Sequence, residues 1–189
     1  MKISEKLIQD CIANNRKAQF ELYQTCYSIL MSVCLRYEKN KEDAEELLNM
    51  GFLKIVTKLE KYQTKIPFEA WIRRIMINTI IDEYRKNKKK NETIEYTDFE
   101  DHNYDRHFDF NEADKNFDAE GLERLIRKLP EMSQKVFNMH VIDGYSHKEI
   151  SDELGISIGT SKWHVSNART MLKEMIQSSI DESIKSIAL

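Results

Sequence analysis

Apolar residues recur at steps of three and four along most of the chain, which is the spacing of one buried helical face. In the first run these positions are Phe20, Tyr23, Tyr27, Leu30, Met31, Cys34 and Tyr37. A second run covers residues 44–59 and begins among the acids of residues 42–46, whose charge suits the positive end of a helix dipole. The pattern predicts two amphipathic helices, preceded by a short helix over residues 4–14.

A third run follows the polar segment 61–66. Pro67 fits the first turn of a helix, and the apolar positions from Phe68 to Ile80 keep the helical spacing into residues 85–90. Residues 1–90 are therefore expected to form a helical bundle.

Helical periodicity returns over residues 119–177. It predicts one short helix over residues 122–129, which stops near Pro130, and a second over residues 136–141, which ends before Asp143-Gly144.

The segment after Gly144 has the signals of a helix-turn-helix. Ser146 and Glu149 form a capping box that starts a helix, and Gly155 suits the left-handed position that ends it. Ser157 can cap a second helix over residues 158–173. Two helices joined by a tight turn with glycine define this DNA-binding motif.

The composition supports a division of the chain into two helical regions separated by an acidic segment. The 189 residues include only five glycines and two prolines, which favours long helices. The net charge of −3 hides an uneven distribution, because residues 91–118 carry two basic and ten acidic side chains. The fold class is therefore expected to be all-α, with two small helical domains (1–90 and 119–177), a flexible acidic linker (91–118) and a short tail (178–189).

Several classes are disfavoured. No run approaches about 20 apolar residues, and the N-terminus lacks an apolar signal-peptide core, so a cytoplasmic location without membrane insertion is expected. Cys11, Cys26 and Cys34 do not form a C-x-x-C pair, and Cys26 and Cys34 suit small core positions. Because no catalytic motif is present, we expect no enzyme, metal or cofactor.

The second helix of the helix-turn-helix suits contact with duplex DNA. Residues 158–173 include Lys162, Arg169 and Lys173 and no acid. The residues at its start are small, polar or basic, and such positions reach base edges and phosphates when a recognition helix enters the major groove.

The end of the first domain combines cations with aromatic rings. Residues 71–90 hold seven basic and two acidic side chains, with Tyr62, Phe68 and Trp71 nearby. Such a combination can bind unstacked, single-stranded DNA. For Phe68 and Trp71 themselves, a core position is the favoured interpretation.

Both segments resemble the extracytoplasmic-function type of the bacterial sigma-70 family of RNA polymerase sigma factors. The motif Asp43-Ala44-Glu45-Glu46-Leu47 and the segment 52–54 resemble the family's polymerase-binding helix, and residues 68–86 resemble the helix facing the promoter −10 element. Residues 144–172 resemble the domain that reads the −35 element.

The resemblance implies roles for particular residues. Core polymerase would be bound by Asp43, Glu45, Glu46, Leu47, Phe52 and Lys54. The melted −10 strand would be held by Tyr62, Lys65, Phe68, Trp71, Arg73, Arg74, Asn78, Arg85 and Lys86, with a flipped-out base captured by the loop 62–67. The −35 duplex would be read by Gly159, Thr160, Ser161, Lys162, His164, Val165, Asn167 and Arg169.

The implied partners are core RNA polymerase, through its clamp and flap, and promoter DNA, with an anti-sigma factor as a further candidate. The sequence departs from the family at Ser151, where Ala is usual, at Ser161, where Val is common, and at Trp163 and His164. The alternative is a helix-turn-helix transcriptional regulator with an N-terminal sensor or dimerisation domain.

Overall fold

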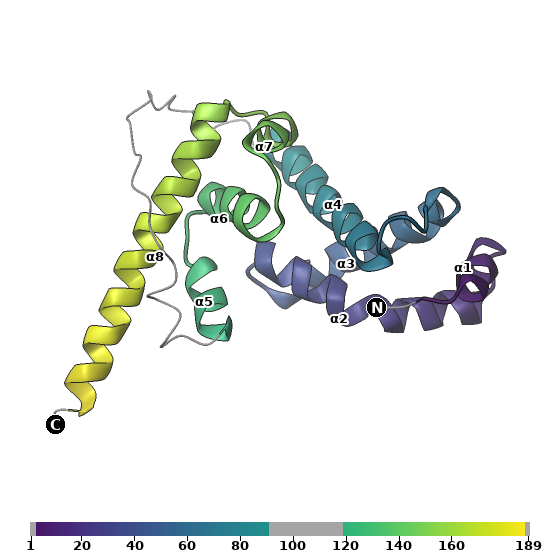
Figure 1. Cartoon of the computed structure of the whole chain (residues 1–189), viewed down its shortest axis with the longest axis horizontal. Coiled ribbons are helices and arrows are strands. Elements are labelled where there is room, and N and C mark those ends of the chain that lie inside the picture. The colour runs from purple at the N-terminus through teal and green to yellow at the C-terminus, as the bar shows by residue number, and fades with distance from the viewer. Residues whose placement is uncertain (1–2, 91–118, 188–189) are drawn as a thin grey trace. The chain divides into compact units, whose positions relative to one another are not determined.

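The computed structural model describes residues 3–90 and 119–187, and every regular element in these ranges is a helix (Figure 1). The all-helical prediction is therefore confirmed for the described residues. The chain divides into two compact units, and the described residues are 3–90 in the N-terminal unit and 119–187 in the C-terminal unit. The predicted acidic linker, residues 91–118, lies outside the described residues.

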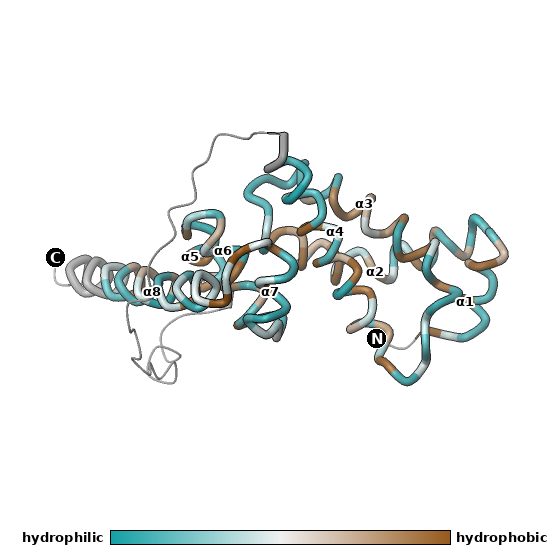
Figure 2. The backbone as a smooth tube through the Cα atoms, turned by 90° about the horizontal axis from the view of Figure 1, so that it is seen from above, coloured by the Kyte–Doolittle hydropathy of each residue, from teal (hydrophilic) through white to brown (hydrophobic). Residues whose placement is uncertain are grey.

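The N-terminal unit is a bundle in which α2 (Arg16–Tyr37), α3 (Lys41–Lys58) and α4 (Phe68–Lys90) pack against one another. The short helix α1 (Glu5–Ile12) lies against α2, and a 3-10 turn, η1 (Leu59–Lys61), follows α3. Hydrophobic and hydrophilic residues alternate along α3 in Figure 2, as expected for a helix that buries one face.

Local sequence sets the start of each of the first three helices. The side chains of Ser4, Asn15 and Asn40 accept hydrogen bonds from backbone N–H groups in the first turns of α1, α2 and α3. Such caps satisfy donors that have no partner within the helix. The core between α2, α3 and α4 is filled by Leu22, Cys26, Leu30, Val33, Cys34, Leu48, Ile55, Ile72, Met76, Ile80 and Ile81.

The C-terminal unit contains α5 (Ala119–Ile126), α6 (Glu131–Phe137), the π-helical turn η3 (Asn138–Ile142), α7 (His147–Leu154) and α8 (Ile158–Ile187). Its core joins α5 and α6 to α8 through Leu125, Ile126, Leu129, Phe137, Ala168 and Leu172. The helix α8 continues to Ile187, beyond the end at Lys173 that the periodicity predicted. No Gly or Pro interrupts residues 174–187, which explains this continuation.

Candidate nucleic-acid and protein interfaces

The predicted helix-turn-helix is formed by α7 and α8. The hydroxyl of Ser146 accepts from the N–H of Glu149 at 3.2 Å, and the N–H of Ser146 donates to the Glu149 carboxylate at 2.9 Å. Gly155 ends α7 in the left-handed conformation with φ of 65°. The hydroxyl of Ser157 then accepts from the N–H of Thr160 at 2.9 Å. The capping box, the glycine turn and the second cap are all confirmed.

The two serines that depart from the family pattern both find partners. The hydroxyl of Ser151 donates to the carbonyl of Ile156 at 2.6 Å, across the turn between the helices. The hydroxyl of Ser161 lies 3.0 Å from Nδ1 of His147. Because each partner satisfies a hydroxyl close to the core, neither serine leaves a buried polar group unpaired.

The proposed −35 residues do not share one face of α8. Gly159, Thr160, Asn167 and Arg169 are half-buried and Lys162 is exposed, whereas Ser161 and Val165 are buried. His164 is turned toward α6, where its Nδ1 lies 3.0 Å from the hydroxyl of Ser133, and burial lowers the pKa of His164. The side chains of Ser161, Val165 and His164 are therefore better suited to holding α8 in place than to contacting DNA.

The exposed face of α8 includes two residues that sequence reasoning did not select. Ile158 and Thr170 are exposed and stand four residues before and eight residues after Lys162, so all three share one face. Ile158 keeps 45% of its surface exposed although it is strongly apolar. The sequence shows an apolar residue at the start of α8, but only the structure shows that Ile158 is exposed and not part of the core.

An aromatic cluster supports the loop before α4. The ring of Tyr62 lies 5.1 Å from the ring of Phe68 and 5.1 Å from that of Trp71. The hydroxyl of Tyr62 donates to the carbonyl of Ile66 at 2.8 Å and so closes the loop. Phe68 is buried, as the sequence favoured, and Trp71 is half-buried. The side chains from Gln63 to Pro67, Lys65 among them, are exposed.

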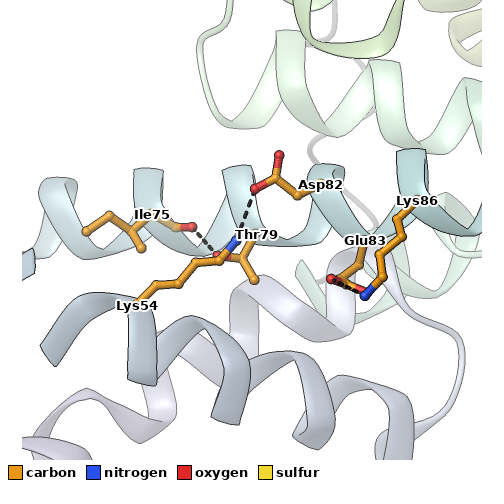
Figure 3. A network of polar contacts seen from close by, with 6 residues as sticks. All are labelled: Lys54, Ile75, Thr79, Asp82, Glu83 and Lys86. Atoms are coloured by element: carbon orange, nitrogen blue, oxygen red, sulfur yellow. Dashed lines mark hydrogen bonds and ion pairs between the residues drawn. The ribbon is translucent and has the colours of Figure 1, made fainter. Parts of the chain in front are cut away.

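The polar residues of α4 divide between two faces. Arg74, Asn78, Asp82 and Arg85 follow at steps of four, four and three, so they share one side of the helix. Arg73 lies on a different face and donates to the Glu69 carboxylate at 2.9 Å and 3.1 Å, which lowers the pKa of Glu69. Lys86 is paired with Glu83 at 3.4 Å (Figure 3). The side chains of Lys88–Lys90 lie outside the described residues.

The proposed polymerase-binding residues also point in different directions on α3. Leu47 is buried, and the ring of Phe52 packs edge-on against Tyr23 at 5.0 Å. Asp43 belongs to the cap of the helix, where Asn40 bonds to it. Glu45 is half-buried and pairs with Lys41 at 3.5 Å, whereas Glu46 is exposed. Leu53, 65% exposed and seven residues after Glu46, lies on the same face; it belongs to the segment 52–54 that carries the resemblance but not to the set of proposed contacts.

The cysteines are inert core residues. Cys11, Cys26 and Cys34 are free and buried, and burial raises the pKa of Cys26 and of Cys34 to about 12, so both thiols stay protonated. Among residues 3–90 and 119–187, no three His, Cys, Asp or Glu side chains gather as metal ligands would. None of the described helices combines the length and apolar character needed to cross a membrane.

Comparison with protein families gives two matches, one in each unit. The model for Sigma-70 region 2 matches residues 22–90, and the model for Sigma-70, region 4 matches residues 119–172. The RNA polymerase sigma factor SigZ of Bacillus subtilis is 32% identical over 136 residues, which are 70% of this chain and 72% of that protein. The ECF RNA polymerase sigma-E factor of Haemophilus influenzae is 21% identical over 183 residues, which are 93% of this chain and 97% of that protein.

Two solved structures also align with the chain. CnrH in complex with the cytosolic domain of CnrY aligns with a TM-score of 0.45 and 17% identity, over 91% of this chain and 96% of that one. The sigma factor RpoE in complex with the anti-sigma factor NepR from Bartonella quintana aligns with a TM-score of 0.49 and 19% identity, over 83% of this chain and 97% of that one.

Proposed function

The chain belongs to the sigma-70 family of RNA polymerase sigma factors, in its extracytoplasmic-function type, and from this membership we propose how its two units divide the work. As a sigma factor it directs promoter-specific initiation of transcription by core RNA polymerase. The proposal concerns the residues through which it does so.

The C-terminal unit reads the −35 duplex with the exposed face of α8. The observation that carries this proposal is a capped helix-turn-helix whose second helix has no acid from residue 158 to residue 173 and exposes Lys162. Lys162 would meet base edges and phosphates with the side chain of Ile158 beside it, and Thr160 would reach the DNA from another side of the first turn.

The N-terminal unit binds the melted −10 strand along α4. Arg74 and Arg85 supply cations on one face, with Asn78 between them, and the closed loop 62–66 presents exposed polar side chains next to that face. Arg74 and Arg85 would bind the phosphates of the strand, and the loop would bind a base that has left the stack.

Core polymerase is bound by the exposed face of α3, where Glu46 and Leu53 lie together. Leu53 would add an apolar contact beside the charge of Glu46 on this face. The clamp and flap of the polymerase are the proposed docking points, and an anti-sigma factor is a further candidate partner. The protein acts in the cytoplasm and performs no catalysis of its own, because the chemistry belongs to the polymerase.

The experiment that tests this function mixes the full chain with core polymerase and a library of random promoter fragments. We expect a stable complex at low salt and start sites that share a −10 and a −35 sequence. A chain that binds duplex DNA specifically without any affinity for core polymerase would instead be the helix-turn-helix regulator described above.

A further inference from the structure

Two histidines meet where η3, α7 and α8 come together in the C-terminal unit. His147, the first residue of α7, places its Nδ1 3.0 Å from the hydroxyl of Ser161 on α8. The ring of His140, from η3, stacks on that of His147 at 4.1 Å with 25° between the planes. His140 is itself fixed, because its Nδ1 donates to the carbonyl of Tyr145 at 2.8 Å.

The bond to Ser161 reaches the start of the recognition helix. Ser161 is fully buried and stands between Thr160 and Lys162, two residues proposed to meet DNA. A buried hydroxyl without a partner is costly, so the position of α8 that keeps this bond is favoured over neighbouring ones. A valine at position 161 would need no such partner.

The surroundings of His147 favour its neutral form. The titratable and charged groups that face it are His140 from η3 and Lys162 and Arg169 from α8. Burial, together with these groups, lowers the pKa of His147. A proton on His147 would place a third cation beside Lys162 and Arg169, and would oppose the approach of α7 to α8.

We propose that His147 is a positioning residue that sets the first turns of α8 through Ser161, so that discrimination between duplex DNA sequences requires neutral His147. This inference rests on the proposed −35 role of the C-terminal unit and adds a residue outside the set assigned to DNA. His147 acts through Ser161 and needs no contact with DNA itself.

The test measures sequence discrimination by the full chain as a function of pH. A duplex is first selected by the wild-type chain from a randomised pool, and the ratio of its affinity to that of a scrambled duplex is followed by fluorescence anisotropy between about pH 5.5 and pH 7.5. We expect the wild-type ratio to fall by about three- to tenfold at the acidic end, where His147 begins to take up a proton.

Three variants separate positioning from general stability. Ser161→Ala should lower the ratio about three- to tenfold at neutral pH, as expected for a lost hydrogen bond, and should flatten its pH dependence. His147→Asn keeps an amide near the place of Nδ1 and cannot be charged, so it should retain the ratio and lose the pH dependence. The matched control is Ser151→Ala, which removes the bond to the carbonyl of Ile156 in the same motif and should keep the wild-type pH profile.

The inference is overturned if Ser161→Ala keeps the wild-type ratio, if His147→Asn remains pH-dependent, or if Ser151→Ala flattens the profile as Ser161→Ala does. A wild-type chain that selects no duplex, alone or in the holoenzyme, would refute the −35 role itself and the inference with it. The wild-type measurement therefore distinguishes a failure of the −35 role from a failure of the inference about His147.

Discussion

The Nζ of Lys54 on α3 lies 3.0 Å from the Oδ2 of Asp82 on α4 (Figure 3). Asp82 shares its side of α4 with Arg74 and Arg85, so a carboxylate stands within the face proposed to hold the −10 strand. Lys54 offsets that negative charge from the neighbouring helix. Its contact with Asp82 thus connects the proposed polymerase-binding helix to the proposed DNA-binding helix.

Replacing Lys54 by Met should weaken binding of single-stranded −10 DNA by the holoenzyme, because Asp82 is left uncompensated beside the phosphates. The expected loss is about two- to fivefold and should shrink as salt is raised. The double variant Lys54→Met with Asp82→Asn should restore the affinity. Folding should change by less than about 1 kcal/mol, since the pair is partly exposed.

The control for this experiment is Lys41→Met, which removes another lysine of α3 that pairs with Glu45 on the same helix. It should leave −10 binding unchanged. If Lys54→Met instead lowers affinity for core polymerase and leaves −10 binding intact, Lys54 contacts the polymerase directly, as the family resemblance implies.

The Tyr62 hydroxyl should shape the loop that takes an unstacked base. Tyr62→Phe removes the bond to the carbonyl of Ile66 and keeps the ring against Phe68 and Trp71. We expect the affinity for the −10 strand to fall by about three- to tenfold, as is usual when one hydrogen bond is lost. Thermal stability should change little. Fluorescence of 2-aminopurine placed in the −10 strand would report whether the base still leaves the stack.

Tyr23→Phe is the matched control, because the hydroxyl of Tyr23 also makes one exposed hydrogen bond, at 3.1 Å to Asn49. Equal losses of −10 affinity in the two variants would show that the loop closed by Tyr62 has no special part in binding.

Gly51 leaves space on α3 for the end of the Met76 side chain from α4. A Cβ added at Gly51 would collide with the end of the Met76 side chain, which is fully buried. Gly51→Val should therefore cost about 1–3 kcal/mol of stability, as overpacking does. Met76→Ala alone should cost about 2–5 kcal/mol through the cavity it leaves.

The double variant Gly51→Val with Met76→Ala should lose less than the sum of the single losses, because the new methyl groups enter the cavity. Chemical unfolding of the full chain measures all three values. Strict additivity would mean that residues 51 and 76 do not compete for the same space.

The difference between Gly51 and Gly155 shows what the sequence could predict. The capping box of α7 and the left-handed Gly155 involve residues three to five positions apart, so their geometry follows from local sequence. The close approach at Gly51 involves Met76, which is distant in sequence and close only after α3 packs on α4. The pairing of Ser161 with His147, 14 residues apart in sequence, was hidden for the same reason.

In the candidate interfaces, too, the sequence predicted the helices but not which of their residues are exposed. Periodicity predicted α3, α4 and α8 as helices, and the family resemblance gave them their roles, but the motifs that carry the resemblance combine inward and outward positions. Leu47 and Val165 belong to the proposed contact sets and are buried, whereas Leu53 and Ile158 were left out and are exposed. An apolar residue carries no mark in the sequence that separates a core position from an interface.

The stability of the C-terminal unit should fall on mild acidification. Burial lowers the pKa of His164, whose Nδ1 is bonded to Ser133, below the value of about 6.5 expected in the unfolded chain. Between the two pKa values the unfolded chain binds more protons, so stability rises with pH in that window. The contribution of neutral His164 is complete above about pH 6.5 and is lost as the pH falls through the folded pKa.

Unfolding followed by the fluorescence of Trp163, whose ring is 4.9 Å from that of His164, would measure this dependence in a Trp71→Phe background. His164→Gln should reduce the slope of stability against pH. The slope that remains should come from the titration of His147. An unchanged slope would show that His164 titrates alike in the folded and unfolded chains.

Lys162 and Arg169 should differ in their effects although both are cations of α8. Lys162 is exposed, so Lys162→Ala should weaken all duplexes alike and reduce the slope of log affinity against log salt by about one, as expected when one phosphate contact is lost. The Nε of Arg169 is buried and its side chain is half-buried, so Arg169→Ala should lower thermal stability and leave that slope nearly unchanged. Lys148→Ala, at an exposed position of α7, is the control for a general loss of positive charge. If Arg169→Ala lowers the slope as much as Lys162→Ala while thermal stability stays the same, Arg169 contacts a phosphate and the DNA-binding face of α8 is wider than the exposure of its side chains indicates.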